Sequence, residues 1–153
     1  AEGAEDADGQ VVTRHGVAPI VLVADCVPIA LVAPEAVAML HAGWRGLAGG
    51  IVAEGVGALR RAGAGRVAAA IGPAAGGCCY EVGDEVRAAF GTDERTLDLA
   101  AIARGQLAAA GVDEVADVGL CTICARDEHG PRFFSHRRDG GVTGRQAGLV
   151  WRS

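Results

Sequence analysis

Residues 17–40 read VAPIVLVADCVPIALVAPEAVAML, and this stretch decides the fold. Three nearly uninterrupted apolar runs, at 17–23, 27–33 and 36–40, follow one another at short intervals. Runs of this kind that are rich in β-branched residues are typical of strands buried on both faces of a sheet. We therefore expect three consecutive strands that form a largely buried sheet.

The segments downstream mix helical and strand patterns. Residues 47–63, 81–90 and 96–111 have the apolar spacing of helices, and the glycine that ends the last segment suits a helix C-cap. Residues 66–71 and 112–120 are expected to form further short strands. Strands followed by a mixture of helices and strands predict an α/β or α+β chain.

The last part of the chain, residues 133–151, reads FFSHRRDGGVTGRQAGLVW. Its Arg-rich turn, centred on Asp139, Gly140 and Gly141, separates two apolar ends. This pattern predicts either a hairpin or a strand bounded by a loop.

Composition limits the kind of protein this is. The chain has 153 residues, of which 50% are hydrophobic, so one domain with one core is expected. Its 14 basic residues, all arginine, and 19 acidic residues give a net charge of -5, which argues against nucleic acid and anionic membranes as partners. No apolar stretch approaches the roughly 20 residues that span a bilayer, and the start, AEGAEDADGQ, lacks the pattern of a secretory signal. A soluble, cytoplasmic protein is therefore expected.

The five cysteines are an odd number and are clustered, which favours free thiols or metal ligands over a disulfide framework. Cys78 and Cys79 lie in a glycine-rich loop before a predicted helix, and we interpret them as packing or backbone constraints. Cys121 and Cys124 form a C-x-x-C motif with no second cysteine pair and no thioredoxin-like context, so a structural role is predicted for them.

Two chemically reactive side chains follow predicted strands. Asp25 and Cys26 come at the end of one strand and His41 at the end of another, so neighbouring strands would bring them to one sheet edge. A thiolate and an imidazole are natural zinc ligands, although a catalytic zinc needs three protein ligands and an open position. The alternative interpretation makes Cys26 a buried small hydrophobe and His41 a hydrogen-bonded core histidine.

The AGWRG segment that follows favours a binding site. Gly43 allows close backbone approach, Trp44 offers a stacking face, and Arg45 offers a planar fork for a carboxylate or phosphate. Arg137 and Arg138 either extend an anion-binding surface or form a solvated turn.

Four motifs make the resemblance to a known family specific. They are ADCVPIALVAPEAVAMLHAGWRG at 24–46, AAIGPAAGGCCYEVGDEV at 69–86, CTICARD at 121–127 and the segment at 133–151. In this order they closely resemble the laccase-domain family, which was first labelled multicopper polyphenol oxidase and is now regarded as containing zinc-dependent purine nucleoside phosphorylases. The resemblance extends from about residue 6 to residue 151.

The resemblance implies a layered α/β sandwich whose mixed, largely buried sheet is covered by helices. It also implies that Cys26 and His41 are two of three metal ligands, and that the cleft around them binds adenosine, inosine or methylthioadenosine together with phosphate. Phosphorolysis of the glycosidic bond and hydrolytic deamination of adenine are the implied activities. Zinc is the implied metal, with copper as the alternative.

A mechanism follows as a hypothesis. The metal polarises a bound phosphate or water while Cys26 stays a thiolate. Arg45 balances the anionic charge, and Asp25 orients a ligand or accepts a proton.

The chain departs from the family pattern near its start. The family's third ligand is a histidine in an upstream Gln-x-His-Gly segment that has no counterpart here, and His15 is interpreted as an exposed turn residue. Family members also carry a preceding N-terminal section. We therefore expect residues 1–153 to form a single laccase-like domain that lacks an N-terminal portion of the family fold.

Two other functions stay open. Copper-dependent polyphenol oxidation, the older family label, is compatible with soft Cys and His ligands, but multicopper oxidases need many more histidines than the 4 in this sequence. A non-catalytic role in the editing of peptidoglycan precursors is the third hypothesis, because bacterial relatives are linked to it. The preferred nucleoside, the metal and the oligomeric state are left open.

Overall fold

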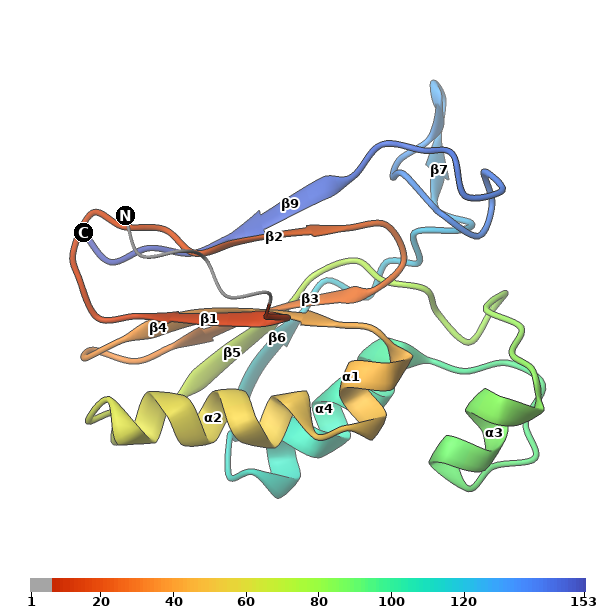
Figure 1. Ribbon diagram of the computed structural model, residues 1–153. Helices are drawn as coiled ribbons and strands as arrows, with labels where there is room; N and C mark the ends of the chain where they lie inside the picture. The colour runs from red at the N-terminus through yellow and green to blue at the C-terminus, as the bar shows by residue number, and fades with distance from the viewer. Residues whose placement is uncertain (1–6) are drawn as a thin grey trace.

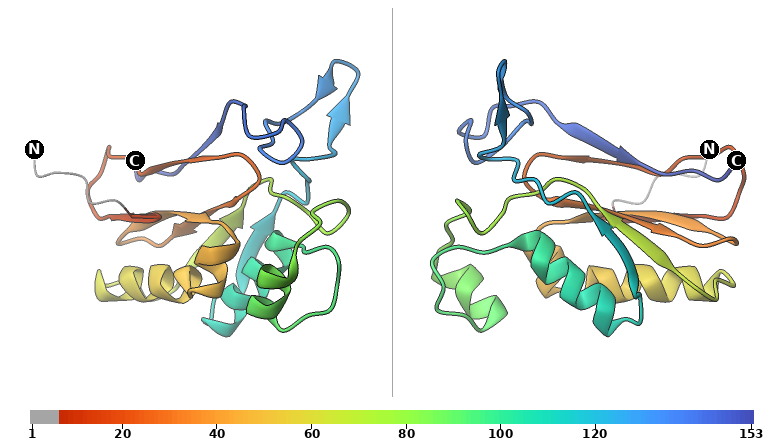
Figure 2. Two further views of the ribbon diagram at one scale, coloured as in Figure 1. Left: turned by 45° about the vertical axis from the view of Figure 1, so that its right-hand side comes forward. Right: turned by 180° about the vertical axis from the view of Figure 1, so that it is seen from behind.

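The computed structural model describes residues 7–153, whose fold has three layers (Figure 1). A two-stranded ribbon lies over one face of a five-stranded sheet, and helices cover the other face (Figure 2). Residues 1–6, which carry most of the acidic start of the chain, lie outside the described residues. The predicted α/β class and layered sandwich are confirmed.

The central sheet has the strand order β1-β4-β3-β5-β6. Its strands are β1 (Gly9–Val12), β3 (Val27–Val32), β4 (Val37–Ala42), β5 (Ala68–Ile71) and β6 (Glu114–Asp117). All neighbours are antiparallel except β5 and β6, which run parallel. A parallel pair needs a long crossover connection, and the chain between these two strands supplies it. The sheet is therefore mixed, as predicted.

Alternation along β3 divides its side chains between two layers. Ile29 and Leu31 are 0% exposed and belong to the core shared with helix α2 (Ile51–Arg61). Ala30, between them, faces the ribbon and packs near Met39 of β4. Both faces of the strand are covered, which explains why its sequence is one uninterrupted apolar run.

Helices α1 (Trp44–Ala48), α2 and α4 (Leu99–Ala109) cover the sheet, while α3 (Asp84–Phe90) lies beside them and contacts α1 (Figure 1). The single helix predicted over residues 47–63 is therefore two helices. Gly50 separates them because its φ of 85° lies in the left-handed region, where an α-helix cannot continue. Within the described part of the chain, no helix is both long and apolar enough to span a membrane.

Helices α3 and α4 begin at residues 84 and 99, later than the predicted 81 and 96. The reason is that Glu81 and Thr96 pair with each other in an isolated antiparallel bridge. Asp98 then caps α4 by accepting a hydrogen bond of 2.9 Å from the Ala101 backbone N–H. Gly111, with a φ of 77°, follows the end of α4, as the sequence predicts.

The first apolar run, residues 17–23, does not join the central sheet. Its strand β2 (Ile20–Val23) pairs antiparallel with β9 (Gln146–Leu149) to form the ribbon. Val23 is 2% exposed on the face toward the sheet, whereas Leu22 is 56% exposed on the other face. The expectation of a strand buried on both faces is wrong for this run, because no helix formed by residues 7–153 covers the outer side of the ribbon (Figure 2).

The C-terminal segment, residues 133–151, contains a strand bounded by a loop rather than a hairpin. Its strand, β9, pairs with the distant β2. A short hairpin does form earlier in the chain, from β7 (Arg126–Asp127) and β8 (Gly130–Pro131).

The layered core predicts unequal effects at adjacent positions of β3. Replacing Leu31, which is 0% exposed, by alanine is expected to lower the free energy of unfolding by about 2–5 kcal/mol. The Val32→Ala control removes a side chain that is 42% exposed on the opposite face and is expected to cost under about 1 kcal/mol. Equilibrium denaturation in urea measures both, and equal losses would contradict the assignment of the two faces.

Candidate active site

A pocket of about 300 Å³ opens where the ribbon, the central sheet and two loops meet. It is lined by Leu22, Ala24, Asp25, Cys26, His41, Tyr80, His136, Arg137 and Arg145. Its volume lies at the lower end of the range for small-molecule sites. A larger groove of about 440 Å³ between β1 and α2 is lined mainly by glycine, alanine and aliphatic side chains. The smaller pocket, with its several polar and titratable groups, is therefore the candidate active site.

Strand register explains how Cys26 and His41 reach this pocket. The pairing of β3 with β4 places Val27 opposite Ala42 and Pro28 opposite His41. Cys26 is therefore a diagonal neighbour of His41 on one face of the sheet, close enough for side chains to interact. Both side chains line the pocket.

Gly43 makes room for the Cys26 side chain. A Cβ atom at position 43 would lie 3.0 Å from Cys26 Sγ, which is tighter than ordinary van der Waals contact. The backbone of Gly43 therefore lies close to the Cys26 side chain. Contact of Gly43 with substrate stays a prediction.

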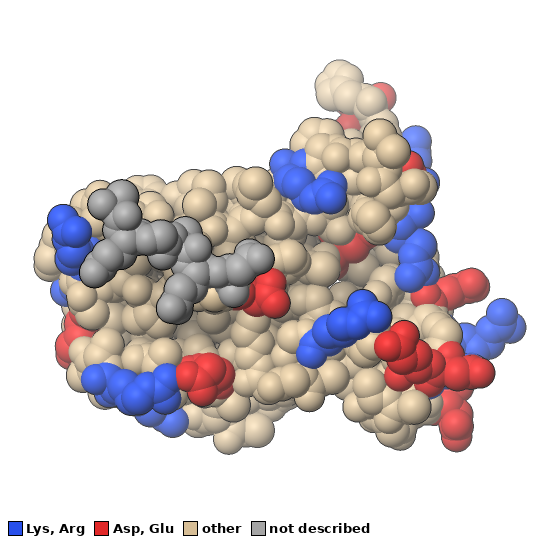
Figure 3. All heavy atoms as spheres, in the orientation of Figure 1, with Lys and Arg blue, Asp and Glu red and all other residues tan. Residues whose placement is uncertain are grey.

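Trp44 and Arg45 begin α1 but are not among the residues that line the pocket. The Arg45 guanidinium lies 4.2 Å from the centroid of the Trp44 ring and 3.5 Å from Glu85 Oε1, and its side chain is 73% exposed. On the face shown in Figure 3, acidic and basic side chains mix around α3 rather than forming a field of one sign. Substrate contacts of Trp44 and Arg45 stay predictions.

Asp25 holds three distant parts of the chain together. Its Oδ1 accepts a hydrogen bond of 2.6 Å from Thr122 Oγ1, while its Oδ2 accepts bonds of 3.1 Å from Ser135 Oγ and 2.7 Å from the Arg137 backbone N–H. The residue is 7% exposed and adopts a φ of 93°, a conformation that a non-glycine residue keeps only when its surroundings enforce it. These contacts favour a positioning role for Asp25, and proton transfer by its carboxylate stays a prediction.

Arg137 and Arg138 point in different directions. Arg137 lines the pocket, where its guanidinium lies 4.8 Å from the centroid of the Tyr80 ring. The Arg138 guanidinium donates to backbone carbonyls of the surrounding loops and pairs with the Asp139 carboxylate. The carbonyls belong to Thr122, Ile123 and Phe133. Arg138 therefore holds the loops together and is not among the residues of the pocket wall.

Three residues of the pocket wall, Tyr80, His136 and Arg145, are not singled out by the sequence pattern. They lie in loops and are brought to the site by long-range contacts, so no periodicity marks them. Burial raises the pKa of the Tyr80 hydroxyl, although the nearby Arg137 acts in the opposite direction. The sequence feature that could have identified these three residues is their position within the motifs at 69–86 and 133–151.

The electrostatic surroundings of Cys26 disfavour a bare thiolate. Burial raises the pKa of Cys26, the carboxylates of Asp25 and Asp8 act in the same direction, and Arg145 opposes them. The His41 Nδ1 atom lies 3.7 Å from Asp8 Oδ1. A cysteine binds a metal ion in the thiolate form, so a cation that binds Cys26 would displace the proton of its thiol.

Comparison with known proteins identifies the family. The sequence matches the family described as multi-copper polyphenol oxidoreductase laccase over residues 1–153. The chain belongs to this laccase family. The resemblance carried by the four sequence motifs is thereby confirmed.

Members and relatives of the laccase family match most of the chain. A protein of Xylella fastidiosa (strain Temecula1 / ATCC 700964), named purine nucleoside phosphorylase, is 39% identical over 163 residues, which are 95% of this chain and 60% of the relative. Adenosine deaminase RL5, from an unknown prokaryotic organism, is 40% identical over 167 residues, which are 97% of this chain and 63% of the relative.

A solved structure shows the same fold. The crystal structure of YlmD from Geobacillus stearothermophilus matches with a TM-score of 0.84 and 39% identity, over 95% of this chain and 61% of that chain. The chain thus spans about 60% of the length of the relatives it matches.

The laccase-family resemblance implies a metal ion bound by Cys26 and His41. The side chains near these two residues can be compared with the ligands that zinc requires. A thiol and an imidazole are suitable zinc donors. Among residues 7–153, however, no third Cys, His, Asp or Glu side chain joins these two closely enough to share an ion. Zinc requires three or more protein ligands, so Cys26 and His41 alone would not complete a zinc site with the described residues.

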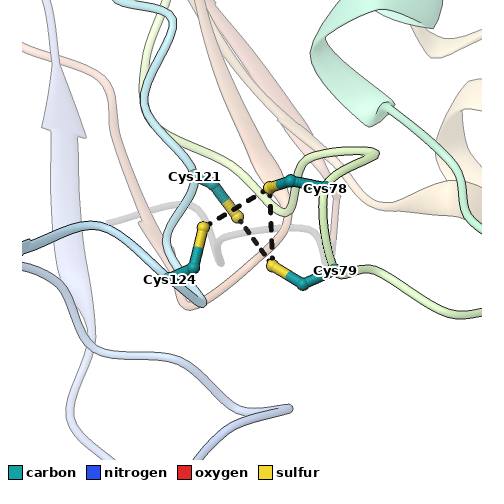
Figure 4. Close-up of side chains that lie close together, drawn as sticks. All are labelled: Cys78, Cys79, Cys121 and Cys124. Carbon is teal, nitrogen blue, oxygen red and sulfur yellow. Dashed lines mark hydrogen bonds between the residues drawn. The ribbon is translucent and has the colours of Figure 1, made fainter.

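A group of four such side chains does occur elsewhere in residues 7–153 (Figure 4). It joins Cys78 and Cys79 to Cys121 and Cys124. The expectation that the C-x-x-C motif has no second cysteine pair is therefore wrong. The partner pair is a Cys-Cys dipeptide in a loop more than 40 residues away, and its spacing is not that of a C-x-x-C motif.

Removing one acceptor from Asp25 tests its role in holding the loops. In Asp25→Asn the amide nitrogen cannot accept, so at least one buried donor loses its partner and the free energy of unfolding is expected to fall by about 1–3 kcal/mol. Urea denaturation measures the change.

The matched control is Asp127→Asn, at an exposed turn where Oδ1 accepts a hydrogen bond of 2.8 Å from the His129 backbone N–H. Asparagine keeps that acceptor, so no measurable loss is expected. Equal stability of the two variants would contradict the positioning role of Asp25.

Proposed function

We propose that the protein is a purine nucleoside phosphorylase that cleaves adenosine, inosine and methylthioadenosine with inorganic phosphate. A relative named purine nucleoside phosphorylase, 39% identical over 95% of the chain, supports this reaction. The observation that carries the proposal is that arginine, tyrosine, histidine and cysteine side chains share one pocket of about 300 Å³. Guanidinium groups suit a phosphate, and an aromatic ring suits a purine.

The phosphate is proposed to bind at Arg145 and Arg137. The Nη1 atom of Arg145 donates to the backbone carbonyls of Thr143 and Gly144 at 3.1 and 2.9 Å, which fixes the guanidinium in place. A guanidinium can donate to two phosphate oxygens at once. Arg137 adds a second positive charge on the pocket wall. Held between them, a phosphate oxygen is oriented toward the ribose.

Phosphorolysis exchanges one bond for another at the ribose. A phosphate oxygen forms a bond to C1′ while the bond from C1′ to the purine nitrogen breaks, and the electron pair of that bond goes to the purine. The phosphate gives up its proton and the departing purine takes up a proton, so the products are the free base and ribose 1-phosphate, or methylthioribose 1-phosphate from methylthioadenosine. A hydrogen bond to the purine stabilises the charge that develops on it. Tyr80 is the proposed donor, because burial raises the pKa of its hydroxyl and keeps it protonated at neutral pH.

Cys26 and His41 are proposed as two ligands of a zinc ion, with copper as the alternative metal for soft ligands. When bound, such an ion supplies Lewis acidity next to the substrate. Cys26 and His41 are two donors, and within residues 7–153 no third Cys, His, Asp or Glu side chain completes a site with them.

Two further activities compete with phosphorolysis. Hydrolytic deamination of adenosine is favoured by the 40% identity to adenosine deaminase RL5. Copper-dependent oxidation of phenols is favoured by the description of the matching family, although the whole sequence has 4 histidines. An editing role on peptidoglycan precursors stays a prediction.

Product analysis separates these activities. Protein supplied with zinc is expected to release adenine from adenosine when phosphate is added and to produce ribose 1-phosphate in equal amount, both measured by chromatography. Inosine formed without phosphate would indicate deamination instead, and oxygen consumed with a phenol would indicate oxidation. Absence of base release from all three nucleosides would refute the phosphorylase proposal.

Removal of the Arg145 guanidinium tests the phosphate site. Arg145→Ala is expected to lower kcat/KM for phosphate by about 10-fold or more, because a hydrogen bond to a charged group is lost. The control is Arg132→Ala, an exposed arginine that is not among the residues lining the pocket, for which unchanged kinetics are expected. Similar kinetics for both variants would remove Arg145 from the phosphate site.

Substitution of the two proposed metal ligands, Cys26 and His41, tests the other part of the site. Cys26→Ala and His41→Ala are each expected to lower turnover strongly, since both side chains line the pocket. Steady-state phosphorolysis assays measure the change, and unchanged turnover in both variants would rule out the proposed centre.

A further inference from the structure

Four cysteine side chains from two turns meet outside the candidate pocket (Figure 4). Cys78 and Cys79 belong to the loop after β5, and Cys121 and Cys124 belong to the loop after β6. Because β5 and β6 are parallel, both loops leave the sheet at the same edge, and an isolated bridge between Ala74 and Cys121 continues their pairing. We call this group the four-cysteine cluster.

The sulfur atoms of the four-cysteine cluster lie close enough together to share one ion. The Cys78 Sγ atom lies 3.5 Å from Cys79 Sγ and 3.4 Å from Cys124 Sγ, and Cys79 Sγ lies 3.5 Å from Cys121 Sγ. All four atoms lie within 4.8 Å of one another. Zinc–sulfur bonds of about 2.3 Å in a tetrahedron place the sulfurs about 3.8 Å apart. Small side-chain movements would therefore bring all four sulfurs to one ion.

The spacing does not describe two disulfides. A disulfide holds its sulfurs about 2.0 Å apart, and all the cysteines are free thiols. Each of Cys78 and Cys79 lies close to its chain neighbour and also to a cysteine of the opposite turn. Figure 4 shows all four sulfurs directed into the space between the two turns. This arrangement is typical of ligands around a common centre.

The backbone supports negative charge on one of the sulfurs. The Gly76 N–H donates a hydrogen bond of 3.3 Å to Cys121 Sγ. A backbone hydrogen bond to a cysteine sulfur stabilises the thiolate form that metals bind.

We propose that the four-cysteine cluster binds one zinc ion as a closed structural site. Four thiolates in a tetrahedron are typical of structural zinc and leave no coordination position for a substrate. The site is separate from the proposed ligands Cys26 and His41, and it does not depend on the proposed phosphorylase activity.

The ion joins two turns whose neighbours shape the candidate active site. Tyr80 directly follows Cys79 and lines the pocket. Thr122 lies inside the C-x-x-C turn and donates to Asp25 Oδ1 at 2.6 Å. A metal bridge between the turns would therefore fix both the tyrosine wall of the pocket and one of the contacts that position Asp25.

Metal content tests the proposal directly. Protein purified without added metal and without chelator is analysed for zinc, iron and copper by mass spectrometry. Cys78→Ser combined with Cys124→Ser, which changes the two exposed ligands, is expected to lose one equivalent of zinc relative to the unaltered protein. The matched control, Cys26→Ser, is expected to keep that equivalent even if it loses activity. Zinc content equal to that of the unaltered protein in the double variant would overturn the proposal.

If the double variant does not fold, a second measurement, made on the Cys26→Ser protein, still tests the proposal. X-ray absorption at the zinc edge of the Cys26→Ser protein is expected to show four sulfur neighbours at about 2.3 Å. A zinc ion with nitrogen or oxygen neighbours, iron or copper in place of zinc, or a disulfide found by mass spectrometry under non-reducing conditions would each overturn the assignment. Absence of phosphorolysis in the unaltered protein, with the cluster zinc present, would refute the proposed function alone.

Discussion

The Asp25 carboxylate is the contact on which the candidate site depends. It accepts hydrogen bonds from Thr122, Ser135 and Arg137, which belong to two loops that are far from it in the sequence. A buried carboxylate is costly without hydrogen-bond partners, so these bonds stabilise the buried position of Asp25. They also hold the residue in its unusual backbone conformation. The turn that carries Cys26 is thereby locked to the loops that form the other wall of the pocket.

The sequence predicts the sheet side of the site because local patterns determine it. Alternation and short apolar runs define β3 and β4, and their register places Cys26 beside His41. The opposite wall is different. Tyr80, His136 and Arg145 lie in loops. The loop that carries His136 is held by the hydrogen bond from the Arg137 N–H to the distant Asp25, and no periodicity in the sequence indicates such a contact.

Tertiary context also explains the errors in the predicted elements. Gly50 adopts a left-handed conformation and divides a helical stripe that the apolar spacing alone makes continuous. Residues 17–23 are as apolar as a central strand, yet they form a ribbon with one exposed face, because their partner β9 lies near the other end of the chain. The meeting of Cys78 with Cys124 likewise follows from the parallel pairing of β5 and β6, which the sequence does not specify.

Hydrogen exchange at the Arg137 amide tests the central claim most directly. This N–H belongs to a surface turn, but it donates a hydrogen bond of 2.7 Å to a carboxylate that is 7% exposed. Nuclear magnetic resonance of the unaltered protein is predicted to show strong protection at Arg137 and fast exchange at Val142, a nearby residue that is 90% exposed. Equally fast exchange at the two amides would show that the Asp25 contact does not hold the loop, and would contradict the account.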